Sequence, residues 1–178
     1  MKKLSLAELG RVDVKTFKGL NKLSLVVLLD NIRSGHNVGA VFRSSDAFLI
    51  EKIILCGITP VPPHREINKS AIGSTASVDW VYEADAKEVV LNYKERGYEI
   101  VGIEQTDESV ILQNYSVDSS KKYLIIMGNE VGGISDDLLP LLDVAIEIPQ
   151  YGTKHSLNVS VCAGVVLWEF FRGMHRIH

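Results

Sequence analysis

The sequence predicts an α/β domain with a mostly parallel sheet of about six strands and helices on both faces. Apolar runs rich in β-branched residues recur along the 178-residue chain. Most of these runs are continuous rather than alternating, which is typical of strands covered on both faces of a parallel sheet. Helix-like segments separate the runs, and this alternation favours the same architecture. The six runs span residues 23–30, 52–57, 78–83, 98–105, 123–130 and 144–150.

Helices are expected after the first, third and fifth strands. Residues 36–48 follow the first strand. Residues 85–97 carry apolar side chains at helical spacing and end in Gly97, a typical C-cap residue. Residues 135–143 begin with Ser135, a candidate N-cap.

The last predicted helix, residues 158–174, is apolar around nearly its whole circumference. Such a helix is buried on more than one side. We therefore expect one face to cover the sheet and the other to meet a second copy of the chain, although complete burial within one subunit is the alternative. Its apolar residues are Val159, Val161, Cys162, Val165, Val166, Trp168, Phe170 and Phe171.

Charge divides the chain into a basic N-terminal arm, residues 1–22, and a single domain, residues 23–178. The arm carries six basic and two acidic side chains, a net charge of +4, whereas the remainder carries −7. The arm is a candidate nucleic-acid contact, and a solvated helix with ordinary lysines is the alternative. No apolar run reaches the roughly 18–20 residues of a membrane span, and no secretory signal is recognisable.

Cysteine and histidine usage favours a cytoplasmic protein without a metal site. Cys56 and Cys162 lie among apolar residues, which indicates buried, reduced thiols rather than a disulfide or a metal pair. His155 has no His or Cys neighbour at metal-ligand spacing, so we predict no metal site.

Polar, glycine-containing segments follow four of the predicted strands. Ligands bind beyond the carboxyl ends of the strands in open α/β sheets, so these segments together predict a site. The first runs from Asn31 to Arg43, and its Gly35 and Gly39 allow close backbone approach. Arg33 and Arg43 are suited to phosphate, although a plain strand-to-helix turn is the alternative. The sequence has neither a dinucleotide fingerprint nor a P-loop.

Two later segments carry the remaining candidate groups. Residues 125–135 place glycines and the carboxylate of Glu130 after a buried strand, where bare backbone groups could line an adenosine pocket. Residues 146–160 contain Ser156 and Asn158, either of which could cap the final helix. Capping accounts for one of these residues but not for all the polar content of the loop.

Taken in order, three of these segments resemble the three motifs of the SpoU-type, or TrmH-class, RNA 2′-O-ribose methyltransferases of the SPOUT superfamily. The similarity covers roughly residues 24–172. Three ordered motifs at strand ends are a far stronger signal than any one motif. The matching residues are Asn37, Gly39 and Arg43 in the first, Gly128, Asn129, Glu130 and Gly132 in the second, and Ile148, Pro149, Ser156, Leu157 and Asn158 in the third.

The resemblance implies a deep C-terminal trefoil knot, a rare exception to ordinary chain topology. It also implies a homodimer that binds S-adenosylmethionine in the knot and methylates a ribose 2′-hydroxyl of RNA without a metal. The implied catalytic residues are Arg43, Asn37, Glu130, Ser156 and Asn158. The implied cofactor-binding residues are Gln105, Thr106, Met127, Gly128, Asn129, Gly132, Ile148, Ser156 and Leu157. The implied RNA-binding residues are Asn31, Arg33 and Arg43.

The resemblance leaves two roles open for Arg43. A ribose hydroxyl is a poor nucleophile until its proton is removed or its oxygen is activated. The family position that Arg43 matches is proposed to accept this proton, although a guanidinium normally keeps its charge. The alternative is that Arg43 grips the adjacent phosphate and stabilises the developing oxyanion. Asn37 and Glu130 are expected to fix Arg43 and the RNA backbone, and Ser156 and Asn158 to organise the third motif.

Other functions compete with this prediction. One is a catalytically silent RNA-binding module on the same fold, and another is a Rossmann-like nucleotide-dependent enzyme, which the missing glycine fingerprint disfavours. A base atom could also replace the ribose as methyl acceptor. The short basic arm, without a separate RNA-binding domain, favours tRNA over rRNA as the substrate.

Overall fold

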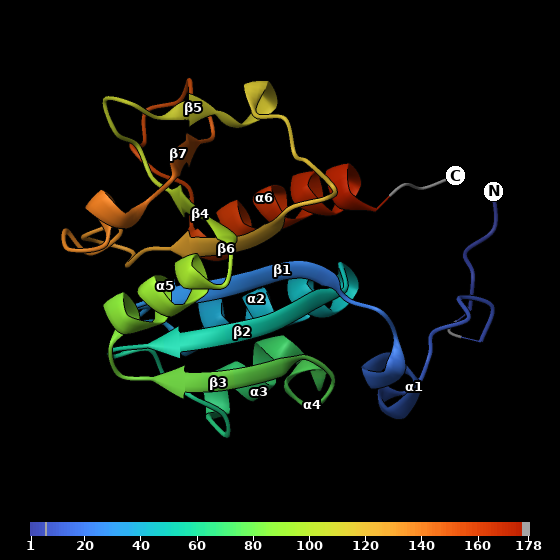
Figure 1. Ribbon diagram of the computed structural model, residues 1–178. Helices are drawn as coiled ribbons and strands as arrows, with labels where there is room; N and C mark the ends of the chain where they lie inside the picture. The colour runs from blue at the N-terminus through green and yellow to red at the C-terminus, as the bar shows by residue number, and fades with distance from the viewer. Residues whose placement is uncertain (6, 176–178) are drawn as a thin grey trace.

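The computed structural model describes residues 1–5 and 7–175, which form seven strands in one sheet (Figure 1). The strand order is β3-β2-β1-β6-β4-β7-β5, and every pairing between neighbours is parallel. All carboxyl ends therefore meet at one edge of the sheet. The strands are β1 Leu23–Asp30, β2 Ile50–Cys56, β3 Asp79–Glu83, β4 Tyr98–Ile103, β5 Val110–Ile111, β6 Lys122–Met127 and β7 Val144–Glu147.

Helices cover both faces of the sheet, as the sequence predicts. The helices α2, α3 and α6 pack on one face and α5 on the other, with α5 in front of the sheet in Figure 1. The helices are α1 Val14–Gly19, α2 Gly35–Ala47, α3 Arg65–Ala71, α4 Ser74–Ser77, α5 Ala86–Glu95 and α6 Val159–Met174, with short 3₁₀ turns η1 Leu112–Asn114 and η2 Leu139–Leu141.

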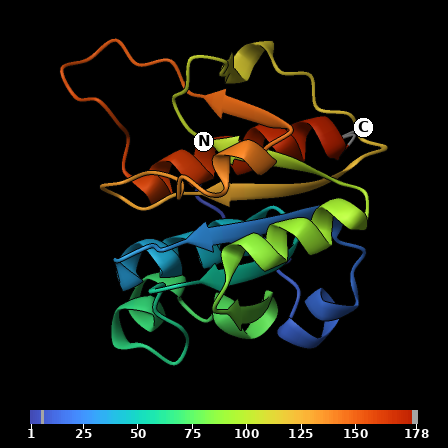
Figure 2. The ribbon, with the colours of Figure 1, turned by 60° about the vertical axis from the view of Figure 1, so that its left-hand side comes forward.

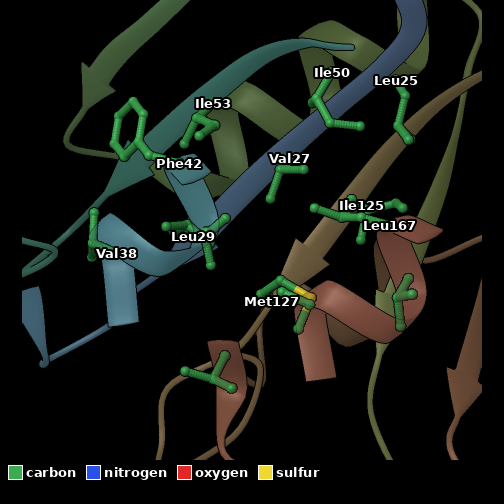
Figure 3. Packing of buried hydrophobic residues seen from close by; sticks show 14 of the residues in the cluster. Leu25, Val27, Leu29, Val38, Phe42, Ile50, Ile53, Ile125, Met127 and Leu167 are labelled. Carbon is green, nitrogen blue, oxygen red and sulfur yellow. The ribbon is translucent and has the colours of Figure 1, made fainter. Parts of the chain in front are cut away.

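The inner strand β1, which lies between β2 and β6, explains why the apolar runs are continuous. Leu25, Val27 and Leu29 belong to the core that α2 and α6 cover, whereas Val26 and Leu28 belong to the core under α5. All five side chains are fully buried, and each contributes roughly 1.5–3 kcal/mol by leaving water. Figure 3 shows the first of these cores, where side chains of β1, β2 and β6 meet those of α2 and α6.

The sheet has one strand more than the sequence predicts. The extra strand, β5, pairs through only two residues with β7 at the edge of the sheet. A two-residue strand leaves no recognisable apolar run, which is why the sequence does not reveal it.

The predicted helix over residues 135–143 is wrong. The segment contains only the 3₁₀ turn η2, with Pro140 inside it. The Ser135 N–H donates to the buried carboxylate of Asp30 at 2.8 Å, which ties the start of the segment to the end of β1. Proline lacks an N–H group, so a regular α-helix could not continue through residue 140.

The end of α5 agrees closely with its prediction. The helix begins after Asp85, whose carboxylate accepts hydrogen bonds from the N–H groups of Lys87 and Glu88 at 2.9 and 3.2 Å. Arg96 is the C-cap, and Gly97 follows with φ +79°. Gly97 therefore occupies the left-handed position just past the cap, where glycine carries no steric penalty.

Part of the basic arm folds against the body of the protein. Phe17 of α1 is 7% exposed and anchors the helix. Lys18 forms an ion pair with Asp79 at 3.5 Å, and the Lys22 ammonium lies 3.4 Å from the centre of the Phe17 ring. Lys18 thus joins the arm to the rest of the chain, whereas Lys22 packs against Phe17 within the arm itself.

A long loop leads from β7 into α6 and stands out from the body in Figure 2. It begins at Ile148 and ends at Asn158, the N-cap of α6. The loop follows the carboxyl end of β7, on the edge where the sequence predicts a site. The trefoil knot stays a prediction from the family resemblance.

Candidate active site

The turn after β1 is held by the side chain of Asn31. This residue has φ +54°, a left-handed conformation that asparagine tolerates better than most residues. Its Nδ2 donates to Asp30 Oδ1 at 2.8 Å and to Ser135 Oγ at 3.3 Å, and its Oδ1 accepts from the Ile58 N–H at 3.1 Å. The Asn31 amide is therefore used to fix the chain.

The segment after β6 forms a tight turn around Asn129. The backbones of Asn129 and Gly133 exchange two hydrogen bonds, of 2.8 and 2.9 Å. The Asn129 Oδ1 accepts from two N–H groups within the turn, and Nδ2 donates to the Asn31 carbonyl at 2.6 Å. Gly128 permits this closure, because a Cβ there would lie 2.2 Å from the backbone of Gly133.

The same turn presents the carboxylate of Glu130 to the start of α2. Glu130 accepts from the N–H groups of Arg33 and Ser34, at 2.9 and 3.1 Å, and from Asn37 Nδ2 at 2.9 Å. Burial acts to raise the pKa of Glu130, but these hydrogen bonds outweigh it and bring the pKa below the ordinary value of 4.5. Glu130 is therefore a carboxylate at neutral pH, placed where the N-terminus of α2 favours negative charge.

Asn37 connects Glu130 to the start of α6. Its Oδ1 accepts from Asn158 Nδ2 at 3.1 Å, and its own side chain is buried. The Asn158 Oδ1 meanwhile accepts from the N–H groups of Ser160 and Val161, at 2.9 and 3.4 Å, as the N-cap of α6. The three sequence motifs are thus joined through the chain Glu130–Asn37–Asn158.

A cavity of about 460 Å³, here called the strand-end cavity, lies beside this network. Its walls come from the carboxyl ends of β4, β6 and β7 and from the loop before α6. The volume falls within the range of small-molecule sites. Nine of the predicted site residues line it: Gln105, Met127, Gly128, Asn129, Glu130, Ile148, Ser156, Leu157 and Asn158.

Neither cysteine is a thiolate at neutral pH. Burial raises the pKa of Cys56 to about 12, and burial, aided by the charge of Glu104, raises that of Cys162 to about 11.

Among the described residues, no three His, Cys, Asp or Glu side chains gather as a metal ion would require. None of the helices in residues 1–5 and 7–175 is long and apolar enough to cross a membrane.

Comparison with known proteins identifies the family. The family model described as "SpoU rRNA Methylase family" matches residues 24–168. The chain belongs to the SpoU rRNA methylase family. A curated relative, the tRNA (guanosine(18)-2′-O)-methyltransferase of Aquifex aeolicus, is 33% identical over 151 residues. That alignment covers 82% of this chain and 67% of the relative, so the chain spans about two thirds of the relative's length.

Solved structures of SpoU proteins share the fold. The A. aeolicus TrmH/SpoU tRNA modifying enzyme superposes with a TM-score of 0.79 at 28% identity, covering 90% of this chain and 81% of that one. The AdoMet-bound rRNA methyltransferase from Sinorhizobium meliloti superposes with a TM-score of 0.78 at 27% identity, covering 88% of this chain and 59% of that one.

In this SpoU protein, Arg43 lies outside the strand-end cavity. It is exposed on α2, six residues after Asn37. Six residues along an α-helix correspond to about 9 Å and to a different side of the helix. Arg43 instead lines a second, open hollow of about 510 Å³, here called the α2–α3 hollow. Arg33 is exposed, and its backbone N–H donates to Glu130.

Two predicted cofactor-binding residues do not line the strand-end cavity either. Thr106 forms a turn in which its carbonyl accepts from the Ser109 hydroxyl at 2.9 Å. Gly132 donates its N–H to Asn129 Oδ1 at 3.1 Å, within the turn after β6. Both residues therefore shape segments that border the cavity.

The sequence reading missed Glu104 as a wall residue of the strand-end cavity. Its Oε1 accepts from the Gln105 N–H and its Oε2 from the Ile134 N–H, both at 2.9 Å. Gly133, with φ +70°, leaves room for this carboxylate, because a Cβ there would lie 2.2 Å from Glu104 Oε2. The feature of the sequence that could have indicated this role is that Glu104 is a single acidic residue near the end of an apolar predicted strand.

Proposed function

We propose that this chain transfers a methyl group from S-adenosylmethionine to the 2′-hydroxyl of a ribose in tRNA or rRNA. The observation that carries the proposal is the hydrogen-bonded chain Glu130–Asn37–Asn158, which joins three separate segments beside one cavity. Membership of the SpoU rRNA methylase family supports it. So do the names of the similar proteins, a tRNA (guanosine-2′-O)-methyltransferase and an AdoMet-bound rRNA methyltransferase.

The strand-end cavity suits S-adenosylmethionine in its chemistry as well as its size. Met127, Ile148 and Leu157 offer apolar surface for the adenine ring, and the carboxylates of Glu104 and Glu130 oppose the positive charge of the sulfonium and ammonium groups. When bound, the cofactor supplies a methyl group activated by attachment to a positively charged sulfur.

The loop before α6 offers further groups to the cofactor. Within its described residues 149–157, the one backbone group with a hydrogen-bond partner is the His155 carbonyl, which accepts from Gln105 Nε2 at 3.2 Å. The other donors and acceptors of this loop are available to a ligand, and buried polar groups of a ligand need such partners. We therefore assign cofactor binding to this loop together with the ends of β4 and β6.

Arg43 acts as a fixed positive charge in this proposal. A guanidinium keeps its proton at neutral pH, and Arg43 is exposed, as contact with a large substrate requires. We assign it to the phosphate next to the reacting ribose, where it stabilises charge developing on the 2′-oxygen. Because Arg43 lies outside the strand-end cavity of its own chain, we assign it to a ribose that reacts at the cavity of a second copy of the chain. This oxygen bonds to the methyl carbon as the carbon–sulfur bond breaks, and the hydroxyl proton leaves to solvent.

We also propose that two copies of the chain associate through α6. Val161, Val165 and Trp168 are 55%, 42% and 45% exposed on this helix, while its opposite face is buried in the core. An exposed apolar face of this kind is typical of a protein interface. Sedimentation velocity should give a dimer for the wild-type chain and a monomer for Val165→Glu.

We take tRNA in the cytoplasm as the first substrate to test. The two cysteines are free thiols, as expected in a reducing compartment. The basic arm adds positive charge, and Lys3, Arg11 and Lys15 within it take part in none of the ion pairs of the described residues.

The test uses Arg43→Ala with tritiated S-adenosylmethionine and bulk tRNA. Transfer should fall by about a hundredfold or more, as when one stabilising donor is removed from other enzymes, while S-adenosylhomocysteine binds as it does to wild type. Arg96→Ala is the matched control, because Arg96 stacks on Tyr93 next to α5, on the opposite face of the sheet. Near-normal transfer by Arg43→Ala would remove Arg43 from the chemistry. A wild-type chain that binds RNA without any transfer would indicate the catalytically silent alternative.

A further inference from the structure

The α2–α3 hollow, which contains Arg43, is positively charged. Three of its lining residues are basic: His36 and Arg43 of α2, and Lys69 of α3. None of its nine lining residues is acidic. The other six are Ala40, Ser44, Ala47, Phe48, Ser70 and Ile72.

Close packing of the two helices holds Lys69 on the same surface as Arg43. Gly39 makes this packing possible, because a Cβ there would lie 2.1 Å from Ser70 Oγ and 2.4 Å from the Ile67 carbonyl. The Ser70 hydroxyl lies 2.9 Å from the His36 carbonyl of α2 and 2.9 Å from the Glu66 carbonyl of α3, and it can donate its one proton to either. Lys69 directly precedes Ser70, and its position relative to Arg43 is therefore fixed by the backbones of both helices.

Neither cation is neutralised by a neighbouring carboxylate. Arg43 and Lys69 appear in none of the ion pairs formed by the described residues. Asp46, the one acidic residue on α2, instead accepts a hydrogen bond from the Ser77 hydroxyl. Lys69 lies in the last turn of α3, where a positive charge stabilises the C-terminal end of the helix. That stabilising role would not require Lys69 to line a hollow together with a second cation.

We propose that Lys69 is an RNA-binding residue, whose ammonium holds a backbone phosphate next to the one assigned to Arg43. This inference rests on the proposed function, since Arg43 marks where the acceptor strand lies. Two exposed cations without an ion-pair partner among the described residues line one hollow, and a nucleic-acid strand binds mainly through its phosphates. Lys69 then fixes the register of the strand, while Arg43 acts at the reacting ribose.

The experiment measures binding of bulk tRNA to the full chain at several salt concentrations. Lys69→Ala should weaken binding by roughly three- to tenfold at low salt and make the slope of log affinity against log salt shallower by about one. Lys87→Ala is the matched control, because it removes the same charge from an exposed site on α5, on the opposite face of the sheet. Lys69→Arg should restore binding.

Two further measurements separate this role from others. Lys69→Ala should raise the KM for tRNA more than it lowers kcat, and leave S-adenosylhomocysteine affinity and the melting temperature close to wild type. If the wild-type chain methylates tRNA but Lys69→Ala and Lys87→Ala give equal salt slopes, the role of Lys69 is overturned while the proposed function stands. A wild-type chain without methyl transfer would contradict the proposed function itself.

Discussion

Replacing Asn158 by alanine tests whether one side chain joins the loop, α2 and α6. The change removes the cap on the Ser160 and Val161 N–H groups, which costs about 1 kcal/mol at a helix N-terminus. It also removes the 3.1 Å hydrogen bond to buried Asn37, which adds about 1 kcal/mol. The free energy of unfolding in urea should therefore fall by about 2 kcal/mol.

Asn158→Ser separates the two contributions. Serine can still cap α6 but is too short to reach Asn37, so about half of the loss should remain. Asn68→Ala is the matched control, because Asn68 is an exposed asparagine whose side chain makes no hydrogen bond in the described structure, and its effect should stay within about 0.5 kcal/mol. S-adenosylhomocysteine affinity, measured by calorimetry, should fall for Asn158→Ala. An unfolding free energy within 0.5 kcal/mol of wild type, with unchanged affinity, would refute the reasoning.

Three more predictions follow from the same contacts. Glu130→Gln should lower the free energy of unfolding most at neutral pH. The difference in unfolding free energy from wild type should narrow as pH falls below 4.5, because Glu130, whose pKa is lowered in the folded chain, adds stability only while it is ionised. Urea unfolding at several pH values measures this difference. Gly39→Ala should cost about 1–3 kcal/mol by pushing α3 away from α2, in the same assay, and a cost near zero would contradict the close contact. Cys162 should react slowly with iodoacetamide at pH 7.5, since its pKa is about 11. Bound S-adenosylhomocysteine should slow this reaction further, and mass spectrometry measures the extent of labelling. Fast labelling that does not depend on the ligand would count against the place of Cys162 in the cavity wall.

Much of the fold was predictable because burial leaves a direct trace in the sequence. The continuous run 23–30 corresponds to β1 residue for residue, since the strand is buried on both faces. Short elements leave a weaker trace. The strand β5 has two residues and α4 has four, and their conformations depend on neighbours that periodicity does not reveal. Residues 135–143 fail as a helix although Ser135 resembles an N-cap, because Pro140 interrupts the segment after one turn.

The candidate site was predictable as a group of segments but not as a geometry. The rule that parallel strands end at one edge places the segments after β1, β4, β6 and β7 together. It does not show that Asn158, rather than Ser156, caps α6 while bonding to Asn37. Nor does it show that Arg43 faces away from the cavity, because that depends on the phase of α2 and on its packing against α3.

The position of the transferred methyl group tests the central claim most directly. The purified chain is incubated with bulk tRNA, and separately with bulk rRNA, together with S-adenosylmethionine whose methyl group carries deuterium. The RNA is then digested to nucleosides for mass spectrometry. The proposed function predicts label on the ribose of one nucleoside, at the 2′-oxygen, and a level of label lower by about a hundredfold or more with Arg43→Ala. Label on a base, or no label in either tRNA or rRNA, would contradict it.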